Sequence, residues 1–188
     1  MNEDAESESE VDAGLVRRAC DGDQRAFGEL VRRHERAAQR LAAFVCGSTS
    51  EAGDVTQEAF LIAYTRLAKL ADGRAFRPWL MRITANTAKN RIRTTVRSRN
   101  REDRVSAFAM APALTPDDRA IAADDANALW RALGDLDHRE RTVVALRFAA
   151  GLSEAETSAA LGIPVGTVKS RTSRAMKALR ERLGDDSD

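Results

Sequence analysis

The sequence predicts an all-α protein with two small helical domains joined by a flexible linker, the second domain containing a helix-turn-helix. The chain is rich in Ala, Leu and Arg, has few aromatic residues and contains only four prolines. Apolar residues recur at steps of three and four along most of its 188 residues, which is the period of an amphipathic helix. This periodicity stops across residues 99–124, between two segments that are each long enough for a small domain.

Charge is strongly segregated along the chain, although the formal net charge is only +1. The first twelve residues contain six acidic groups and no base, so we predict a disordered acidic tail over residues 1–12. From Arg74 to Arg104, ten Lys and Arg residues are accompanied by only two acidic residues, Glu102 and Asp103. This asymmetry indicates a nucleic-acid partner.

The inventory of reactive residues argues against a metal site or a cofactor. Cys20 and Cys46 are isolated thiols, and the only histidines, His34 and His138, are far apart in sequence. No apolar run approaches the ~18–20 residues that a membrane span needs, and the acidic N-terminus is unlike a signal peptide. We therefore expect a soluble cytoplasmic protein with reduced thiols and no membrane insertion.

The first domain is predicted to span residues 13–98 and to begin with two helices between Val11 and Cys46. Apolar residues fall at helical spacing on both sides of the sequence Asp21-Gly22-Asp23, which predicts the break between these helices.

A third helix is predicted from Asp54 to Leu67, with two different faces. Phe60 and Tyr64 have the spacing of core positions. The other face consists of Asp54, Gln57, Glu58 and Leu61. A solvated acidic face explains the polar residues, whereas Leu61 beside them suits a surface that docks on another protein. The residues alone leave both interpretations open.

The stretch from Phe76 to Arg97 predicts a long helix with two incompatible faces. Its apolar stripe includes Trp79 and Ile83, so we expect Trp79 to pack in the core rather than to stack on a base. The second stripe contains basic and amide side chains, namely Arg82, Asn86, Lys89, Arg93 and Arg97. A cationic row interrupted by amides predicts a surface that holds a polyanion while Asn86 or Asn90 makes a specific contact.

Residues 99–124 are predicted to be an interdomain linker, because so long a segment without periodicity is unusual inside a compact domain. The second domain is predicted over residues 125–184. Two capping-box patterns, Asp137 with Glu140 and Ser153 with Glu156, open helices within it. The second of these helices, a turn at Gly162 and a longer helix from Val165 to Leu183 make a helix-turn-helix.

The helix from Val165 to Leu183 is predicted to be the recognition helix of that motif. Early residues of such a helix reach base edges, while basic side chains contact phosphates. The candidate DNA-binding residues are Gly166, Thr167, Lys169, Ser170, Arg171, Ser173, Arg174 and Lys177. A solvated basic face is the alternative interpretation, which the capped preceding helix disfavours.

Three motifs together resemble the bacterial sigma factors of the extracytoplasmic-function group. They are DVTQEAFLIAY at residues 54–64, FRPWLMRITANTAKNRIR at 76–93, and LRFAAGLSEAETSAALGIPVGTVKSRTSRAMKALRERL at 146–183. The resemblance extends from about Asp12 to Leu183 and implies that the two domains are sigma regions two and four. It also implies three partners: core RNA polymerase, promoter DNA and an anti-sigma protein.

The resemblance implies a role for each helix. The helix over 54–64 would dock on core polymerase through Asp54, Gln57, Glu58 and Leu61. The helix over 76–97 would capture the melted non-template strand of the −10 element, with the loop at 70–76 forming a pocket for a flipped base. The implied −10 set is Arg74, Phe76, Arg82, Asn86, Lys89, Asn90 and Arg93. The last helix would contact the −35 element in the major groove, and its small Ser173 is a departure that prevents transfer of a promoter sequence.

Two other functional hypotheses remain beside the sigma factor. A free-standing helix-turn-helix regulator would bind duplex DNA without polymerase, but it leaves the basic Asn-bearing helix unexplained. A nuclease or other enzyme would need a carboxylate cluster or an activated nucleophile, which the sequence does not offer, so we expect no enzyme activity.

Overall fold

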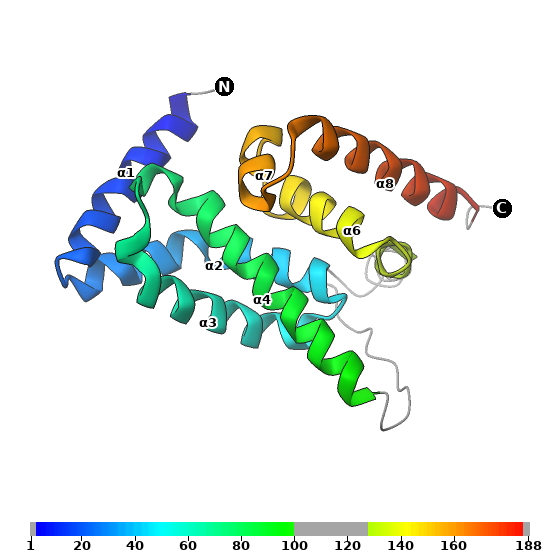
Figure 1. Cartoon of the computed structure of the whole chain (residues 1–188), viewed down its shortest axis with the longest axis horizontal. Coiled ribbons are helices and arrows are strands. Elements are labelled where there is room, and N and C mark those ends of the chain that lie inside the picture. Colours follow the sequence, from blue (N-terminus) through cyan, green and yellow to red (C-terminus); the bar gives the residue numbers. More distant parts are fainter. Residues whose placement is uncertain (1–2, 100–127, 186–188) are drawn as a thin grey trace, which may run out of the picture.

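The computed structural model describes residues 3–99 and 128–185, and every regular element in this part of the chain is helical (Figure 1). The predicted all-α fold class is therefore confirmed. Nearly all of the predicted linker lies outside the described residues. None of the described helices is both long enough and apolar enough to cross a membrane.

The N-terminal unit consists of α1 (Glu3–Cys20), α2 (Gln24–Cys46), α3 (Thr49–Arg66) and α4 (Phe76–Arg99). Two short 3-10 turns, Leu67–Lys69 and Gly73–Ala75, connect α3 to α4. Helices α2, α3 and α4 pack against one another, and their facing sides provide the core (Figure 1). The largest fully buried side chains there are Leu30, Leu41, Phe76, Leu80 and Met81.

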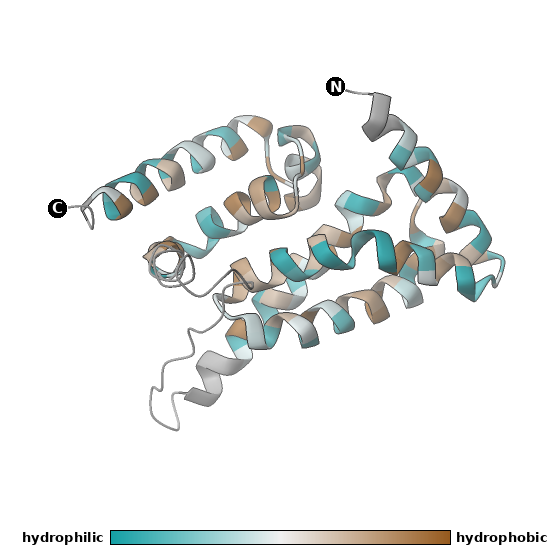
Figure 2. Cartoon of the chain, turned by 180° about the vertical axis from the view of Figure 1, so that it is seen from behind, coloured by the Kyte–Doolittle hydropathy of each residue, from teal (hydrophilic) through white to brown (hydrophobic). Residues whose placement is uncertain are grey.

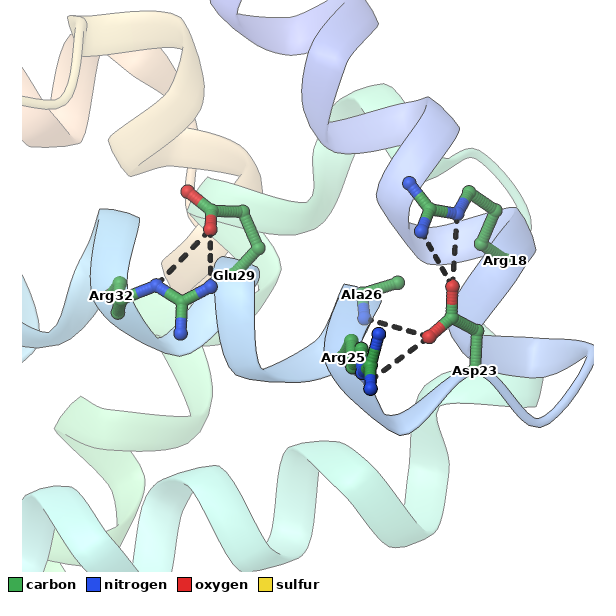
Figure 3. A network of polar contacts seen from close by, with 6 residues as sticks. All are labelled: Arg18, Asp23, Arg25, Ala26, Glu29 and Arg32. Carbon is green, nitrogen blue, oxygen red and sulfur yellow. Dashed lines mark hydrogen bonds and ion pairs between the residues drawn. The ribbon is translucent and has the colours of Figure 1, made fainter.

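The break predicted at residues 21–23 separates α1 from α2. Gly22 has a φ of 95°, a conformation that glycine adopts without steric cost. Asp23 caps α2 by accepting hydrogen bonds from the backbone N–H groups of Arg25 and Ala26 at 3.0 and 3.2 Å (Figure 3). The guanidinium of Arg18 donates to the same carboxylate, and this hydrogen bond is the main reason why the pKa of Asp23 is lowered.

The acidic N-terminal segment differs from its prediction. The structure has α1 beginning at Glu3, so the predicted disordered tail over residues 1–12 is wrong from Glu3 onward. Asp12 is only 2% exposed. Its Oδ2 lies 2.7 Å from His34 Nε2, and its Oδ1 accepts a hydrogen bond from Arg33 Nε at 2.9 Å. The composition of this segment shows its acidic charge. It does not show that Asp12 has partners more than twenty residues away in the sequence.

The C-terminal unit contains a helical stretch at 128–134, α6 (His138–Val144), a π-helical turn (Ala145–Ala149), α7 (Glu154–Leu161) and α8 (Val165–Asp185). The predicted capping box of α7 is present, since Glu156 N donates to Ser153 Oγ at 3.1 Å and Ser153 N donates to Glu156 Oε2 at 2.7 Å. Gly162 ends α7 with a φ of 64° and turns the chain into α8, as expected for a helix-turn-helix.

The first capping box of this unit is incomplete. Asp137 accepts a hydrogen bond from Arg139 N at 3.2 Å, as an N-cap residue should. Glu140 does not complete the box, because its carboxylate pairs with Arg174 of α8 at 3.0 Å. Glu140 therefore ties α6 to the predicted recognition helix.

The two units pack against each other, with α6 and the π-helical turn contacting α2 and with α7 contacting α4 (Figure 1). Arg77 Nη2 donates to the carbonyl oxygens of Ala150 at 2.7 Å and Gly151 at 3.2 Å. Arg40 Nε donates to the carbonyl oxygen of Ala149 at 3.2 Å. These carbonyl groups lie at the end of the π-helical turn, where no following helical turn supplies N–H donors. The two arginines supply the donors instead.

Apolar side chains also join the two units. Leu146 and Leu152 are almost fully buried and belong to the same hydrophobic cluster as the core of the N-terminal unit. Phe44 of α2 and Trp130 have ring centroids 5.0 Å apart. Figure 2 shows the same molecule from behind, with polar residues spread over the outer faces of both units. The closed arrangement thus rests on apolar burial as well as on hydrogen bonds.

Candidate nucleic-acid interface

The exposed side of α4 presents the predicted polyanion-binding stripe. Arg82, Asn86, Lys89, Asn90 and Arg93 are all exposed, whereas Leu80, Met81, Thr84 and Ala88 on the opposite side are buried. Within the described part of the chain, the three basic residues of this stripe form no ion pair. Arg91, one step to the side, differs because its Nη2 lies 2.9 Å from Asp54 Oδ2.

The loop that precedes α4 is held against α1. Asp72 accepts a hydrogen bond from Arg74 N at 2.9 Å, which shapes the 3-10 turn. A Cβ atom on Gly73 would lie 2.8 Å from Ala13 Cα, so only glycine allows this close approach. Arg74, a predicted −10 residue, is exposed, and its Nε lies 3.0 Å from Glu10 Oε1. Helix α1 therefore packs against the loop at which the base pocket is predicted.

Phe76 does not lie on this surface. Its side chain is 0% exposed and packs between His34, at a ring distance of 5.4 Å, and Trp79, at 6.0 Å. The prediction that Phe76 contacts the −10 element does not fit this structure, because its position at the start of α4 points the ring into the core. Trp79 is half-buried against the same core, in agreement with its predicted packing role.

Helix α8 carries the predicted −35 residues, with Val168, Ala175 and Leu179 buried on its inner side. Gly166, Lys169, Ser170, Ser173, Arg174 and Lys177 are exposed, while Thr167 and Arg171 are half-buried. Three of its basic residues have carboxylate partners. Lys169 pairs with Glu154 at 3.6 Å, Arg174 with Glu140 at 3.0 Å, and Lys177 with Glu181 at 3.8 Å.

The outer face of α3 presents the predicted polymerase-binding residues. Asp54, Gln57, Glu58 and Leu61 are all exposed, and Leu61 is 63% exposed. Tyr64 was expected in the core, but it is 49% exposed, with its ring 4.9 Å from that of Phe27. Gln57, Leu61 and Tyr64 line a groove between α2 and α3, so an apolar surface adjoins the acidic one.

A cleft between α4 and the C-terminal unit brings the two predicted DNA-binding surfaces together. Its volume is about 340 Å³. Arg82, Asn86 and Lys89 line it from α4, and Arg171 lines it from α8. His138, Arg139 and Thr142 of α6 also line it, and none of these three is among the residues predicted from the sequence. Burial, followed by the charges of Lys89 and Arg141, lowers the pKa of His138.

Groups suited to other chemistry are not assembled. Among the described residues, no three His, Cys, Asp or Glu side chains are grouped so that they can hold a metal ion. Burial raises the pKa of the Cys46 thiol to about 12, so its reactive thiolate is scarce at neutral pH. Cys20 is exposed.

The similarity to known proteins covers both units. Residues 30–98 match the family Sigma-70 region 2, and residues 126–179 match the family Sigma-70, region 4. The ECF RNA polymerase sigma factor SigW of Bacillus subtilis is 31% identical over 178 residues, covering 90% of this chain and 95% of SigW. The ECF RNA polymerase sigma-E factor of Escherichia coli is 33% identical over 185 residues, covering 94% of this chain and 96% of the relative.

Solved structures agree with these matches. The structure of CnrH in complex with the cytosolic domain of CnrY has a TM-score of 0.71 and 31% identity, covering 94% of this chain and 99% of CnrH. The sigma factor RpoE of Bartonella quintana, solved with the anti-sigma factor NepR, has a TM-score of 0.71 at 24% identity, covering 84% and 96%, and shares the fold. The chain belongs to the ECF family of RNA polymerase sigma factors.

Proposed function

We propose that this sigma factor docks on core polymerase through α3, captures the melted non-template strand of the −10 element on α4 and contacts the −35 element with α8. The observation that carries the proposal is the row of exposed Lys and Arg side chains on α4 around Asn86, which have no ion-pair partner among the residues that the structure describes. A helix that needed only solubility would gain from neighbouring carboxylates. This row instead leaves its charge free for phosphates.

The strand-capture step has a clear energetic basis. A base cannot be recognised on its pairing edge inside a stack, and extruding it costs a few kcal/mol. Arg82, Lys89 and Arg93 offset part of that cost by neutralising phosphates and releasing counterions. Asn86 both donates and accepts hydrogen bonds, as recognition of a base edge requires. Because Phe76 is buried, the proposed strand-binding set omits it.

The pocket for the flipped base is proposed at the loop before α4. Gly73 packs on Ala13, which fixes the loop without using a long side chain. Arg74 stands exposed at its edge and exchanges its contact with Glu10 for a phosphate when DNA arrives. An exposed ion pair is weak, about 0–1 kcal/mol, so this exchange costs little.

The proposed partners are core RNA polymerase, promoter DNA and an anti-sigma protein. The structure of CnrH, to which this chain is similar, contains the cytosolic domain of a second protein. In the closed arrangement the C-terminal unit lies over Asn86 and Lys89, so we propose that the two units separate before the strand binds.

In vitro transcription on fragmented genomic DNA with purified core polymerase tests the proposal. We expect run-off transcripts that core polymerase alone does not produce, and their start sites will define both promoter elements. If no fragment gives a dependent transcript while the purified chain alone binds a duplex tightly and specifically, the free-standing regulator is the better description.

Docking has its own test. The double variant Asp54→Ala/Gln57→Ala should weaken binding to core polymerase about tenfold or more, because it removes two exposed polar groups from the proposed interface. Arg66→Ala, exposed at the end of the same helix, is the control and should bind as the parent does. Equal loss in both proteins would place the interface elsewhere.

A further inference from the structure

The cleft between α4, α6 and α8 is strongly cationic. Arg82 and Lys89 face it from the N-terminal unit, and Arg139 and Arg171 face it from the C-terminal unit. None of its described lining residues is acidic. None of these four bases forms an ion pair with any residue that the structure describes, although Arg174 and Lys169 nearby do.

Closing the two units therefore places like charges opposite one another without compensation. Like charges that line one cleft repel, and the low-dielectric walls of the cleft concentrate their field. Burial first, and then the charges of Lys89 across the cleft and of Arg141, lower the pKa of His138, while Asp137 acts in the opposite direction. The apolar contacts between the two units keep these charges near one another despite their repulsion. A bound anion would reduce the repulsion.

The remaining walls of the cleft suit a small organic molecule. Ala85, Ala160, Leu161 and Ile163 provide an apolar side, and Asn86 provides an amide. The volume of about 340 Å³ lies within the range of ligand pockets, ~300–1,000 Å³, and is far too small for a DNA duplex. Cationic groups together with a few apolar groups in one cleft match a phosphate chain attached to a nucleoside.

We propose that this cleft binds a nucleoside di- or triphosphate, which bridges α4 to α6 and α8 and holds the two units closed. The guanidinium groups of Arg139 and Arg171 and the ammonium group of Lys89 contact the phosphates, and the apolar wall contacts the base. The ligand occupies Arg82, Asn86 and Lys89, so it excludes a DNA strand from the same groups. This site goes beyond the proposed function, and its occupancy is measurable without polymerase.

The experiment is a calorimetric titration of the full-length chain with ATP and, separately, with inorganic tripolyphosphate, in buffer without magnesium. We expect saturable binding of one molecule of either probe, and tighter binding of ATP because the apolar wall contributes. Arg139→Gln should weaken both about tenfold, the effect of losing one charge-assisted hydrogen bond. Arg139 is outside the proposed DNA-binding sets, so its loss does not confuse the two functions.

Arg36→Gln is the matched control, since Arg36 is an exposed arginine on α2 outside the cleft. It should bind both probes like the parent. No saturation by millimolar ATP and tripolyphosphate would overturn the proposal, and so would equal weakening by Arg36→Gln, which would indicate diffuse attraction. Equal affinity for the two probes would overturn the nucleoside part of it.

Closure is measured by energy transfer between a donor dye on Cys20, which is exposed, and an acceptor dye on Arg180→Cys in α8. ATP should raise the transfer efficiency of the labelled Arg180→Cys protein and leave that of the same protein carrying Arg139→Gln nearly unchanged at the same concentration. A short single-stranded oligonucleotide should displace ATP. Simultaneous binding of oligonucleotide and ATP would overturn the assignment of Arg82, Asn86 and Lys89 to the ligand.

Discussion

Helices α4 and α8 both carry rows of basic residues, but the two rows differ in how many of these residues have a carboxylate partner. On α8, Lys169, Arg174 and Lys177 each have a carboxylate partner within 4 Å. On α4, Arg82, Lys89 and Arg93 have none among the described residues. Surface ion pairs add little stability, so the pairs on α8 matter more for the charge they offset and the rotamers they favour.

This difference suits two kinds of nucleic-acid contact. A Lys or Arg side chain that is paired with a carboxylate attracts phosphates less strongly and is already oriented. This favours its contacts to the edges of nucleobases in a groove. An unpaired row attracts any phosphate backbone strongly and depends on a neighbouring group, here Asn86, for selectivity. The proposed roles of α4 at the −10 element and α8 at the −35 element therefore depend on the neighbouring carboxylates as much as on the Lys and Arg residues.

The largest expected effect comes from removing the selective group on α4. Asn86→Ala should weaken binding of the single-stranded −10 element by holoenzyme about tenfold to a hundredfold, the worth of a good base contact at ~1–3 kcal/mol. Affinity for core polymerase should not change. The measurement is fluorescence anisotropy of a labelled −10 oligonucleotide, with the sequence taken from the mapped transcripts.

Asn90→Ala is the comparison for that prediction, because Asn90 is a second exposed amide of the proposed strand-binding set that does not line the cleft. It should have the smaller effect. Since Asn86 is exposed, its replacement should also leave the melting temperature nearly unchanged. A large drop in melting temperature would show that the side chain is structural.

The salt dependence of binding sharpens the comparison between the two helices. Lys89→Gln should reduce the slope of log K against log salt by about 0.7 on the single-stranded −10 element, the full value for one phosphate contact. Lys169→Gln should reduce the slope on the −35 duplex by clearly less than about 0.9, because Glu154 already offsets its charge. Equal fractional reductions of the two slopes would mean that a carboxylate partner makes no difference to how a lysine contacts phosphate.

A smaller effect is expected from removing the carboxylate partner of Arg174 on α8. Glu140→Gln removes the carboxylate that holds Arg174. Binding of holoenzyme to unrelated duplex should become a fewfold tighter, whereas discrimination in favour of the −35 element should fall. Glu181→Gln is the control, because Glu181 lies on α8 itself and its partner Lys177 is farther away at 3.8 Å. Tighter binding to both DNAs in the same proportion would contradict an orienting role for Glu140.

The sequence was sufficient for the fold class and for the exposed stripe of α4, because both depend on local periodicity. It was insufficient where a residue is defined by a distant partner. Asp12 appeared to belong to a disordered tail until His34 and Arg33 were found beside it. Arg139 has no distinctive local pattern, since only the packing of the C-terminal unit on α2 and α4 brings it to the cleft.

The smallest expected effect concerns the contact between the two units and depends on pH. The pKa of His138 is lowered in the folded chain by burial and by Lys89 and Arg141, with Asp137 acting in the opposite direction. The unfolded chain then binds more protons than the folded chain as pH falls through about 6.5, so stability decreases on acidification. From about pH 7.5 to about 5.5, the parent should lose more melting temperature than His138→Gln, which cannot be protonated. His34 is present in both proteins and cancels from the comparison. Equal losses in the two proteins would mean that burial and Lys89 do not lower the pKa of His138 in solution, and the contact between α4 and the C-terminal unit would then be wrong.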